Sequence, residues 1–350
     1  MSYQALINHL AFGAVLFVFS VLICFFLLKN AWIIDVPNVR SSHNIPTPKS
    51  GGISIVLTFI AGIIVIYFIS DSIAINKKYF MGFMFSSLML ACVSLYNDKY
   101  NLHYYVRMFF QVIAAITVMV CGLIITEISL PWVGNVKLGV TGPVLTLLWI
   151  VGMTNAYNFM DGIDGLAGGT AFITSLVFSI LCYMQGSSLV YLVSYGMISG
   201  CLGFLFFNFP KARLFMGDVG SIFIGFSFAN ISIMASLYDQ SHTSLFVIPL
   251  LLFHFIWDTI YTFFRRGING ENVFMSHRTH LYQLFNRLGY SHNTVSYTHF
   301  IMSLFQCAGA WILLKIPGSN RLFVFVPFIL FQMIYTRFIV RRAKQLNIIK

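Results

Sequence analysis

The chain reads Asn155-Ala-Tyr-Asn158-Phe-Met-Asp161-Gly-Ile-Asp164-Gly-Leu-Ala-Gly168-Gly169 between two long apolar segments. Asp and Glu together number only 10 of 350 residues, so two carboxylates three positions apart concentrate the scarce charge. A carboxylate at the edge of a hydrocarbon layer is costly and marks a functional site by default. A helical turn presents residues three apart on one face, and the flanking glycines permit tight backbone geometry. A purely structural role for both aspartates is a weak alternative, because capping a helix needs only one.

The composition around this motif is that of an integral membrane protein. The chain is 58% hydrophobic and 9% charged, with a mean hydropathy of +0.83, whereas soluble domains carry roughly 25% charged residues. A membrane span needs about 20 mainly apolar residues. We therefore predict an all-α, polytopic protein, a single domain over residues 1–350. Its eleven expected transmembrane helices cover residues 4–28, 53–70, 80–96, 105–125, 143–157, 170–185, 189–207, 219–238, 244–264, 295–314 and 322–340.

The distribution of Lys and Arg predicts the orientation. If the first loop is cytoplasmic, sixteen of the 21 Lys and Arg residues lie on that side. By the positive-inside rule the N-terminus is then outside and the C-terminus cytoplasmic. All six cysteines fall inside expected spans, so we expect neither a disulfide framework nor a zinc site. The formal charge of +11 suits lipid headgroups and phosphorylated substrates, and a chain without a basic soluble module is not expected to bind nucleic acid.

Five polar loops then face the cytoplasm, at residues 29–52, 97–104, 158–169, 208–218 and 265–294. In the first loop, Arg40 and His43 are the candidate binding residues. Alternatively, this loop is a rigid turn whose charges interact with lipid headgroups. In the second, Asp98 and Lys99 precede Arg107, which shares a helix face with Gln111 four positions later. This cation could receive a lipid phosphate; alternatively Asp98 pairs with Arg107 or Lys99 and merely closes the loop.

The third and fourth loops add amides, a carboxylate and an aromatic ring. Asn155 and Asn158 repeat the spacing of three on the helix that leads into the opening motif. Asp218 stands at the expected start of a span, where the alternative is a simple helix N-cap. Phe215 could stack on a base, although a lone Phe there more often anchors at the membrane interface.

The fifth loop contains Ser276-His277-Arg278-Thr-His280-Leu-Tyr-Gln283. Leu281, Leu284, Phe285 and Leu288 have helical spacing and Gly289 can end the segment, so we expect a short amphipathic helix at the membrane interface. His277 and His280 resemble a metal pair in spacing, but no thiolate or third histidine is nearby, so phosphate recognition is favoured. In the ninth expected span, His254 and Asp258 are four apart and could satisfy one another.

Together these loops resemble the polyprenyl-phosphate N-acetylhexosamine-1-phosphate transferases of glycosyltransferase family 4, and the likeness covers nearly the whole chain. Its specific parts are Asn-x-x-Asn-Phe-Met-Asp-Gly-Ile-Asp-Gly-Leu at 155–166 and Phe-Met-Gly-Asp-x-Gly-Ser at 215–221. Asp-x-Pro-x-x-Arg-x-x-His at 35–43 and His-Arg-x-His-Leu-Tyr-Gln at 277–283 favour the nucleotide-sugar branch, like the undecaprenyl-phosphate GlcNAc-1-phosphate transferases, over the pentapeptide one. One departure is Asn97-Asp98, where the family usually has two adjacent aspartates. Either Asp98 suffices or the activity is lower.

The resemblance implies transfer of HexNAc 1-phosphate from a UDP-sugar to undecaprenyl phosphate in the bacterial inner membrane, with release of UMP and with Mg²⁺, or Mn²⁺, as cofactor. Charge neutralisation is what such a reaction needs most, because two anions must approach each other. By family correspondence Asp218 holds the metal, and the catalytic residues are Asp98, Asp161, Asp218 and His280. The other correspondences are Asp164 and Phe215 for the uracil, Asn158 and Asp161 for the diphosphate, and Arg278 and His280 for a phosphate. The remaining substrate-binding candidates are Arg40, His43, Lys99, Arg107, Asn155 and His277.

Two alternatives of other kinds stay open. A transporter of an anionic metabolite would place its site near the bilayer midplane, between repeats and broken helices, whereas the acids here lie at expected helix ends and no repeat is visible. The CDP-alcohol phosphotransferases continue their motif with Asp-Gly-x-x-Ala-Arg, which is absent after Asp161. The particular sugar, the downstream glycan (O-antigen, teichoic acid or another), a homodimeric assembly and the choice between single and double displacement are left open by the sequence.

Overall fold

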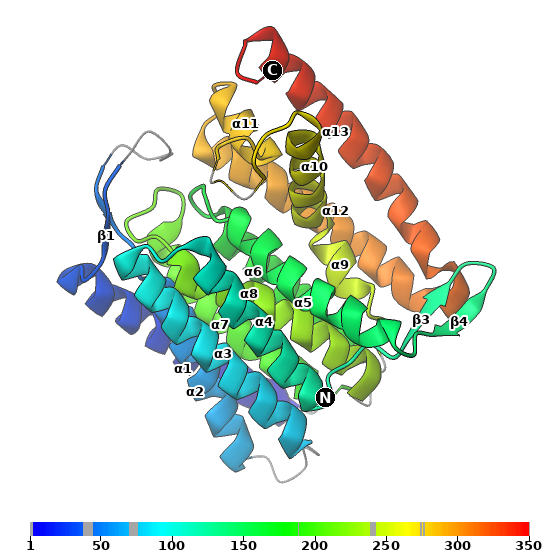
Figure 1. Ribbon diagram of the computed structural model, residues 1–350. Helices are drawn as coiled ribbons and strands as arrows, with labels where there is room; N and C mark the ends of the chain where they lie inside the picture. Colours follow the sequence, from blue (N-terminus) through cyan, green and yellow to red (C-terminus); the bar gives the residue numbers. More distant parts are fainter. Residues whose placement is uncertain are drawn as a thin grey trace.

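The computed structural model describes residues 3–37, 45–69, 76–187, 189–238, 243–273, 275 and 277–349 (Figure 1). Within these ranges the chain forms thirteen α-helices. They are α1 (Tyr3–Asn30), α2 (Gly52–Ile69), α3 (Lys77–Tyr100), α4 (Tyr104–Val120), α5 (Thr141–Phe159), α6 (Leu166–Met184), α7 (Leu189–Asn208), α8 (Gly217–Ile233), α9 (Val247–Leu251), α10 (Phe253–Ile268), α11 (Leu281–Arg287), α12 (His292–Lys315) and α13 (Val326–Gln345). A π-helical turn, Met234–Tyr238, extends α8, and a 3-10 helix, Gly318–Phe325, precedes α13.

The prediction of a polytopic, helical membrane protein is confirmed. Six helical segments of the described chain are long and apolar enough to cross a membrane: Ile7–Asn30, Lys77–Tyr100, Leu166–Met184, Gly217–Leu237, His292–Lys315 and Gly318–Gln345. Gly52–Phe68, Tyr104–Val120 and Val193–Asn208 are shorter apolar helices. Helices suit this environment because each satisfies its own backbone hydrogen bonds where water is absent. In Figure 1, α1 begins at the opposite end of the bundle from the end of α13.

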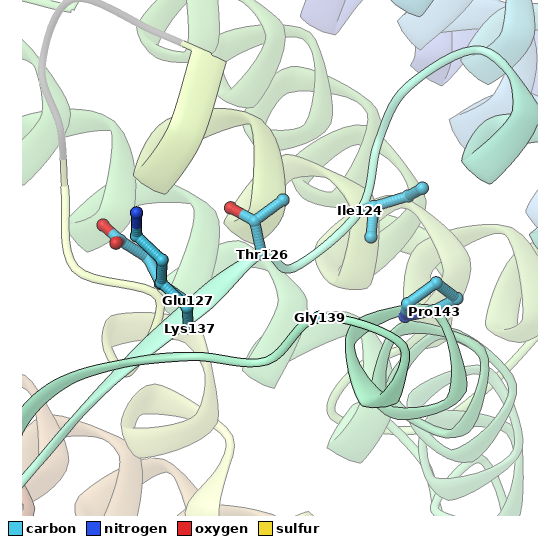
Figure 2. A pocket seen from close by; sticks show the side chains of 6 residues that line it. All are labelled: Ile124, Thr126, Glu127, Lys137, Gly139 and Pro143. Carbon is cyan, nitrogen blue, oxygen red and sulfur yellow. The ribbon is translucent and has the colours of Figure 1, made fainter.

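The strands form two small antiparallel ribbons at opposite ends of the bundle (Figure 1). One pairs β1 (Ile34–Asp35) with β2 (Thr47–Pro48), and the other is a hairpin of β3 (Glu127–Leu130) and β4 (Gly134–Lys137). A cavity of about 430 Å³ lies beside that hairpin, lined by Ile124, Thr126, Glu127, Lys137, Gly139 and Pro143 (Figure 2). This cavity is therefore remote from the loops that carry the candidate site residues.

Helix α8 is the centre of the bundle. All its residues except Asp218 are buried, and it packs against α2, α3 and α5. Glycines make these contacts close: a Cβ built on Gly52 of α2 would lie 2.3 Å from the backbone nitrogen of Gly220. Gly52 thus lets the start of α8 approach closely, and the first turn of α8 is held beside the first loop.

The ninth expected span is wrong as a single helix, because the chain breaks at Leu252 between α9 and α10. The buried amide of Gln306 on α12 forms hydrogen bonds to backbone groups on both sides of this break. In the orientation that satisfies both of its atoms, the amide donates to the Leu251 carbonyl at 3.0 Å and accepts from the His254 backbone N–H at 3.1 Å. The apolar sequence of this segment could not predict the break, because Gln306, which forms hydrogen bonds at the break, lies about fifty residues later in the chain.

The expected amphipathic helix in the fifth loop exists as α11. Its apolar residues Leu281, Leu284 and Phe285 are buried against the protein, where α11 contacts α12 and α13, and its location at the membrane interface stays a prediction. Phe285 lies with its ring centroid 6.1 Å from that of Tyr335. The helical spacing thus reported a buried face, and protein rather than lipid covers it.

Candidate active site

The candidate site is built around Asp218, in the first turn of α8. Its Oδ2 accepts from Asn97 Nδ2 at 2.7 Å and from Arg107 Nη1 at 2.8 Å. Its Oδ1 accepts from Asn158 Nδ2 at 3.1 Å, and the same amide donates to Ser221 Oγ at 2.8 Å. Residues from α3, α4 and α5 therefore meet at one carboxylate, and three of the residues singled out from the sequence lie in direct contact.

Asp98 fastens α3 to the N-terminus of α8. Its Oδ1 accepts from the Asp218 backbone N–H at 3.1 Å and its Oδ2 from that of Val219 at 3.2 Å. These are donors that a helix leaves without internal partners at its first turn. Gly217 makes room for the contact, because its φ is +74° and a Cβ there would lie 2.6 Å from Asp98 Oδ2.

The alternative in which Asp98 pairs with Arg107 or Lys99 is wrong, because Asp98 Oδ1 lies 2.9 Å from Lys49 Nζ. Burial alone would lower the pKa of Lys49, but the carboxylates of Asp98 and Asp218 raise it above its ordinary value. Arg107 instead pairs with Asp218. Lys99 lies outside the cluster, exposed, with its Nζ 5.1 Å from the centroid of the Tyr100 ring.

Lys49 is the functional candidate that the sequence analysis missed. Its position is set by the backbone: Lys49 bridges Phe215 in a parallel arrangement, and Phe215 N donates to the Pro48 carbonyl at 2.8 Å. The first and fourth loops are thus joined beside Asp98. A signal was present, because Lys49 is the only Lys or Arg between Arg40 and Lys77 and lies two residues before the Gly51-Gly52 pair.

Asp161 lies in the loop between α5 and α6. Among the described residues its carboxylate has no hydrogen-bond or ion-pair partner. Burial and the negative charges of Asp218 and Asp98 raise its pKa, Lys49 partly opposes them, and the net value is about 7. The loop therefore presents a carboxyl group to a region of negative potential, where a bound cation would stabilise its ionised form.

The other residues of the third loop and its helix have structural partners. Asn155 Nδ2 donates to Gln111 Oε1 at 2.5 Å, which ties α5 to α4. Asp164 accepts from the Ala212 backbone N–H at 3.1 Å and lies 3.2 Å from His292 Nδ1. The structure therefore does not bring Asn155 or Asp164 into contact with Asp218. Asp164 joins the third loop to the fourth loop and to α12.

The last loop docks onto the third loop through Tyr282. The Tyr282 hydroxyl donates to the Phe159 carbonyl at 2.9 Å, and a Cβ on Gly162 would lie 2.3 Å from that hydroxyl. His277 and His280 stack with ring centroids 4.8 Å apart. His280 Nδ1 lies 3.0 Å from Asp258 Oδ1, so the expected pairing of Asp258 with His254 is wrong. Arg40 and His43 lie outside the described residues.

The donor set fits Mg²⁺ better than a metal held by protein ligands alone. Within the described ranges no group of three or more His, Cys, Asp or Glu could hold a metal ion. Mg²⁺ commonly uses one or two carboxylates together with substrate phosphates and water, and Asp218 and Asp161 can supply these carboxylates. Lys49 and Arg107 offer two positive charges against the three carboxylates of Asp98, Asp161 and Asp218, so the cluster can accept further cationic charge.

Comparison with known proteins gives one family match and several relatives. The model of "Glycosyl transferase family 4" matches residues 80–236. A probable undecaprenyl-phosphate N-acetylglucosaminyl 1-phosphate transferase of Bacillus subtilis is 30% identical over 305 residues, which cover 86% of this chain and 83% of that protein. An undecaprenyl-phosphate alpha-N-acetylglucosaminyl 1-phosphate transferase of Yersinia pestis is 29% identical over 292 residues, covering 79% and 76%. A decaprenyl-phosphate N-acetylglucosaminephosphotransferase of Mycobacterium tuberculosis is 30% identical over 290 residues, covering 74% and 70%.

Proposed function

The chain belongs to glycosyl transferase family 4, and from this premise we propose that it transfers HexNAc 1-phosphate from a UDP-activated sugar to undecaprenyl phosphate. A phosphate oxygen of the lipid forms a bond to the sugar-linked phosphorus, and the bond from that phosphorus to the bridging oxygen breaks. UMP leaves with that oxygen, and the lipid carries the sugar on a diphosphate. The product would begin assembly of a cell-surface glycan.

The observation that carries this proposal is the convergence of charges at the start of α8. Lys49 and Arg107 each contact one carboxylate of the pair Asp98 and Asp218 at under 3 Å. Cations held this way can turn toward phosphate oxygens, which reduces the repulsion between two anionic substrates. Phosphoryl transfer needs such positioning and charge stabilisation far more than a covalent helper.

Asp218, with Asp161, would hold Mg²⁺, which when bound neutralises phosphate charge. Asn158 lies beside Asp218 and can donate to a diphosphate oxygen once its amide turns. Arg278 and His280 would contact a phosphate from the last loop, and Asp164 and Phe215 would contact the uracil. Arg40 and His43 remain predictions for substrate binding, as do Lys99, Asn155 and His277.

The proposed topology follows from the charge distribution. We infer about eleven crossings of a bacterial inner membrane, with the N-terminus outside and the C-terminus and the active site in the cytoplasm, where UDP-sugars are made. A transporter would place its charges near the bilayer midplane, whereas Asp218, Asp98 and Asp161 lie at or beyond helix ends. This placement favours the transferase over the transporter.

The test is a transfer assay with purified protein, undecaprenyl phosphate and a panel of radiolabelled UDP-HexNAc donors, with and without Mg²⁺. We expect label in the lipid fraction and UMP in equal amount, for at least one donor and only with the divalent cation. Asp218→Asn, made in the same membranes, is the matched control for contaminating transferases. Release of UMP without labelled lipid, or no reaction with any donor, would contradict the proposal.

A further inference from the structure

Asp258 on α10 is a buried carboxylate to which the proposed reaction assigns no role. Its side chain is 2% exposed, and its Oδ1 accepts from His280 Nδ1 at 3.0 Å, the Leu281 backbone N–H at 2.9 Å and Thr262 Oγ1 at 3.0 Å. Its Oδ2 accepts from the Tyr282 backbone N–H at 3.1 Å. Three of these four donors belong to consecutive residues of the last loop, at the point where α11 begins.

This arrangement makes Asp258 an N-terminal cap supplied by another helix. The first backbone N–H groups of a helix have no internal partners, and a carboxylate that accepts from them is stabilised by the hydrogen bonds and by the helix dipole. Because Asp258 is buried, water would not readily satisfy these N–H groups if the carboxylate were lost, and unsatisfied buried donors would destabilise the start of α11. The direction of α11 and the side of the His280 ring that faces the loop are thus fixed by one group.

The cap is linked to the candidate active site through Tyr282. The backbone N–H of Tyr282 donates to Asp258. The hydroxyl of the same residue donates to the Phe159 carbonyl and lies next to Gly162. Gly162 directly follows Asp161. Gln283 Nε2 donates to the same hydroxyl at 3.1 Å, and its Oε1 accepts from the His280 backbone N–H at 3.2 Å. A shift at Asp258 would therefore move the last loop relative to Asp161.

We propose that Asp258 is a positioning residue: its carboxylate holds the start of α11 so that Arg278 and His280 face the sugar nucleotide and Tyr282 seats the Asp161 loop. The kinetic part of this inference rests on the proposed transferase function, and the structural part does not. In this proposal Asp258 acts through His280 and Tyr282, with which it forms hydrogen bonds.

The decisive variant is Asp258→Asn, which keeps the shape and turns one acceptor oxygen into a donor that faces backbone N–H groups. Amide hydrogen exchange of the segment 277–288 is measured in the full-length protein in nanodiscs. We expect exchange at Leu281 and Tyr282 to rise about tenfold, the usual scale for loss of a helix cap and its charged hydrogen bond. Exchange in α3 and α8 should stay at the parental level.

Kinetics then separate positioning from general damage. We expect Asp258→Asn to lower kcat/KM for the UDP-sugar about tenfold or more, mainly through KM, while KM for undecaprenyl phosphate changes less than about twofold. Thr262→Val removes one hydrogen bond but keeps the carboxylate, so it should lie close to the parent. Glu271→Gln is the matched control, because it neutralises a carboxylate of the same loop whose ion-pair partner among the described residues is Arg266, at 2.9 Å.

Each outcome decides the inference. Faster exchange confined to the last loop, together with the KM effect, supports it. Parental exchange at Leu281 and Tyr282, or equal loss in Glu271→Gln, overturns it, and so does faster exchange throughout the bundle. If the parent transfers no sugar at all, the proposed function fails, and the exchange measurement alone still decides whether Asp258 holds α11.

Discussion

Replacing Asn97 by Asp puts a negatively charged carboxylate where the structure has an amide group that donates to Asp218. Asn97 Nδ2 donates to Asp218 Oδ2 at 2.7 Å, and in the isosteric variant two carboxylates would face each other at that point. Two unit charges centred ~4 Å apart repel by about 4 kcal/mol at an effective dielectric constant of about 20. Loss of a hydrogen bond to a charged acceptor adds about 1.5–3 kcal/mol. Arg107 Nη1, at 2.8 Å from the same oxygen, offsets part of this repulsion.

A divalent cation should offset this destabilisation. A metal ion between two carboxylates turns their repulsion into shared attraction, so Asn97→Asp should be less stable than the parent in EDTA and regain stability in excess Mg²⁺. Asn97→Ala separates the two contributions, because it loses the donor without adding charge and should respond to Mg²⁺ like the parent. The assay is thermal unfolding of the purified variants, with EDTA and with Mg²⁺.

Turnover of the same proteins tests the chemistry. We expect the parent to be active with Asn97 and Asn97→Asp to change the rate little at saturating Mg²⁺. Asp98→Asn should lower the rate by about 10² or more, because it removes a carboxylate that can act as a general base and that also caps α8. An inactive parent rescued only by Asn97→Asp would refute this reasoning, and so would equal stability of Asn97→Asp and parent in EDTA.

Three further predictions use single positions. Asp218→Asn should abolish transfer at a normal expression level, and near-normal Mg²⁺-dependent turnover would rule out Asp218 as the metal residue. Lys49→Gln should destabilise the protein by about 2–3 kcal/mol, less than the roughly 3–5 kcal/mol of a fully buried pair, because the Lys49 side chain is 26% exposed. Since its folded pKa is raised, the difference from the parent should stay constant from neutral pH to about pH 9. In a cysteine-free background, Lys211→Cys should react with an impermeant maleimide from the cytoplasmic side only and Lys137→Cys from the outside only; the reverse result would invert the topology.

The sequence predicted what depends on local pattern. Apolar length located the helices, and helical spacing with Gly289 located α11 to within a residue or two. Scarcity of charge pointed to Asp98 and Asp218, and the spacing of three from Asn155 pointed to Asn158. The side chains of Asp98 and Asn158 both form hydrogen bonds to Asp218, Asn158 to its carboxylate and Asp98 to its backbone N–H. These signals work because a membrane makes long apolar helices and stray carboxylates equally conspicuous.

The sequence could not predict which polar groups meet. Spacing offered a cation a few residues away as an alternative partner of Asp98, but its partner Lys49 belongs to another loop. Spacing also allowed Asp258 to pair with His254 on the same helix, but Asp258 accepts from residues more than twenty positions later. Spacing identifies a shared helix face, whereas these pairings depend on how separate helices pack, and nothing local encodes that.

Glycine contacts explain how groups from distant segments reach the start of α8. Gly51 and Gly52 donate their N–H groups to the Phe215 and Met216 carbonyls, both at 2.8 Å, so the first loop is bound to the fourth by backbone alone. Lys49 is thereby held beside Asp98 without depending on their ion pair for its position. The charged side chains can then exchange a carboxylate for a phosphate oxygen or a metal ligand while the backbone stays fixed. Such a cluster is preorganised for the reaction, and its ion pairs, Lys49 with Asp98 and Arg107 with Asp218, can still be exchanged for contacts with a substrate.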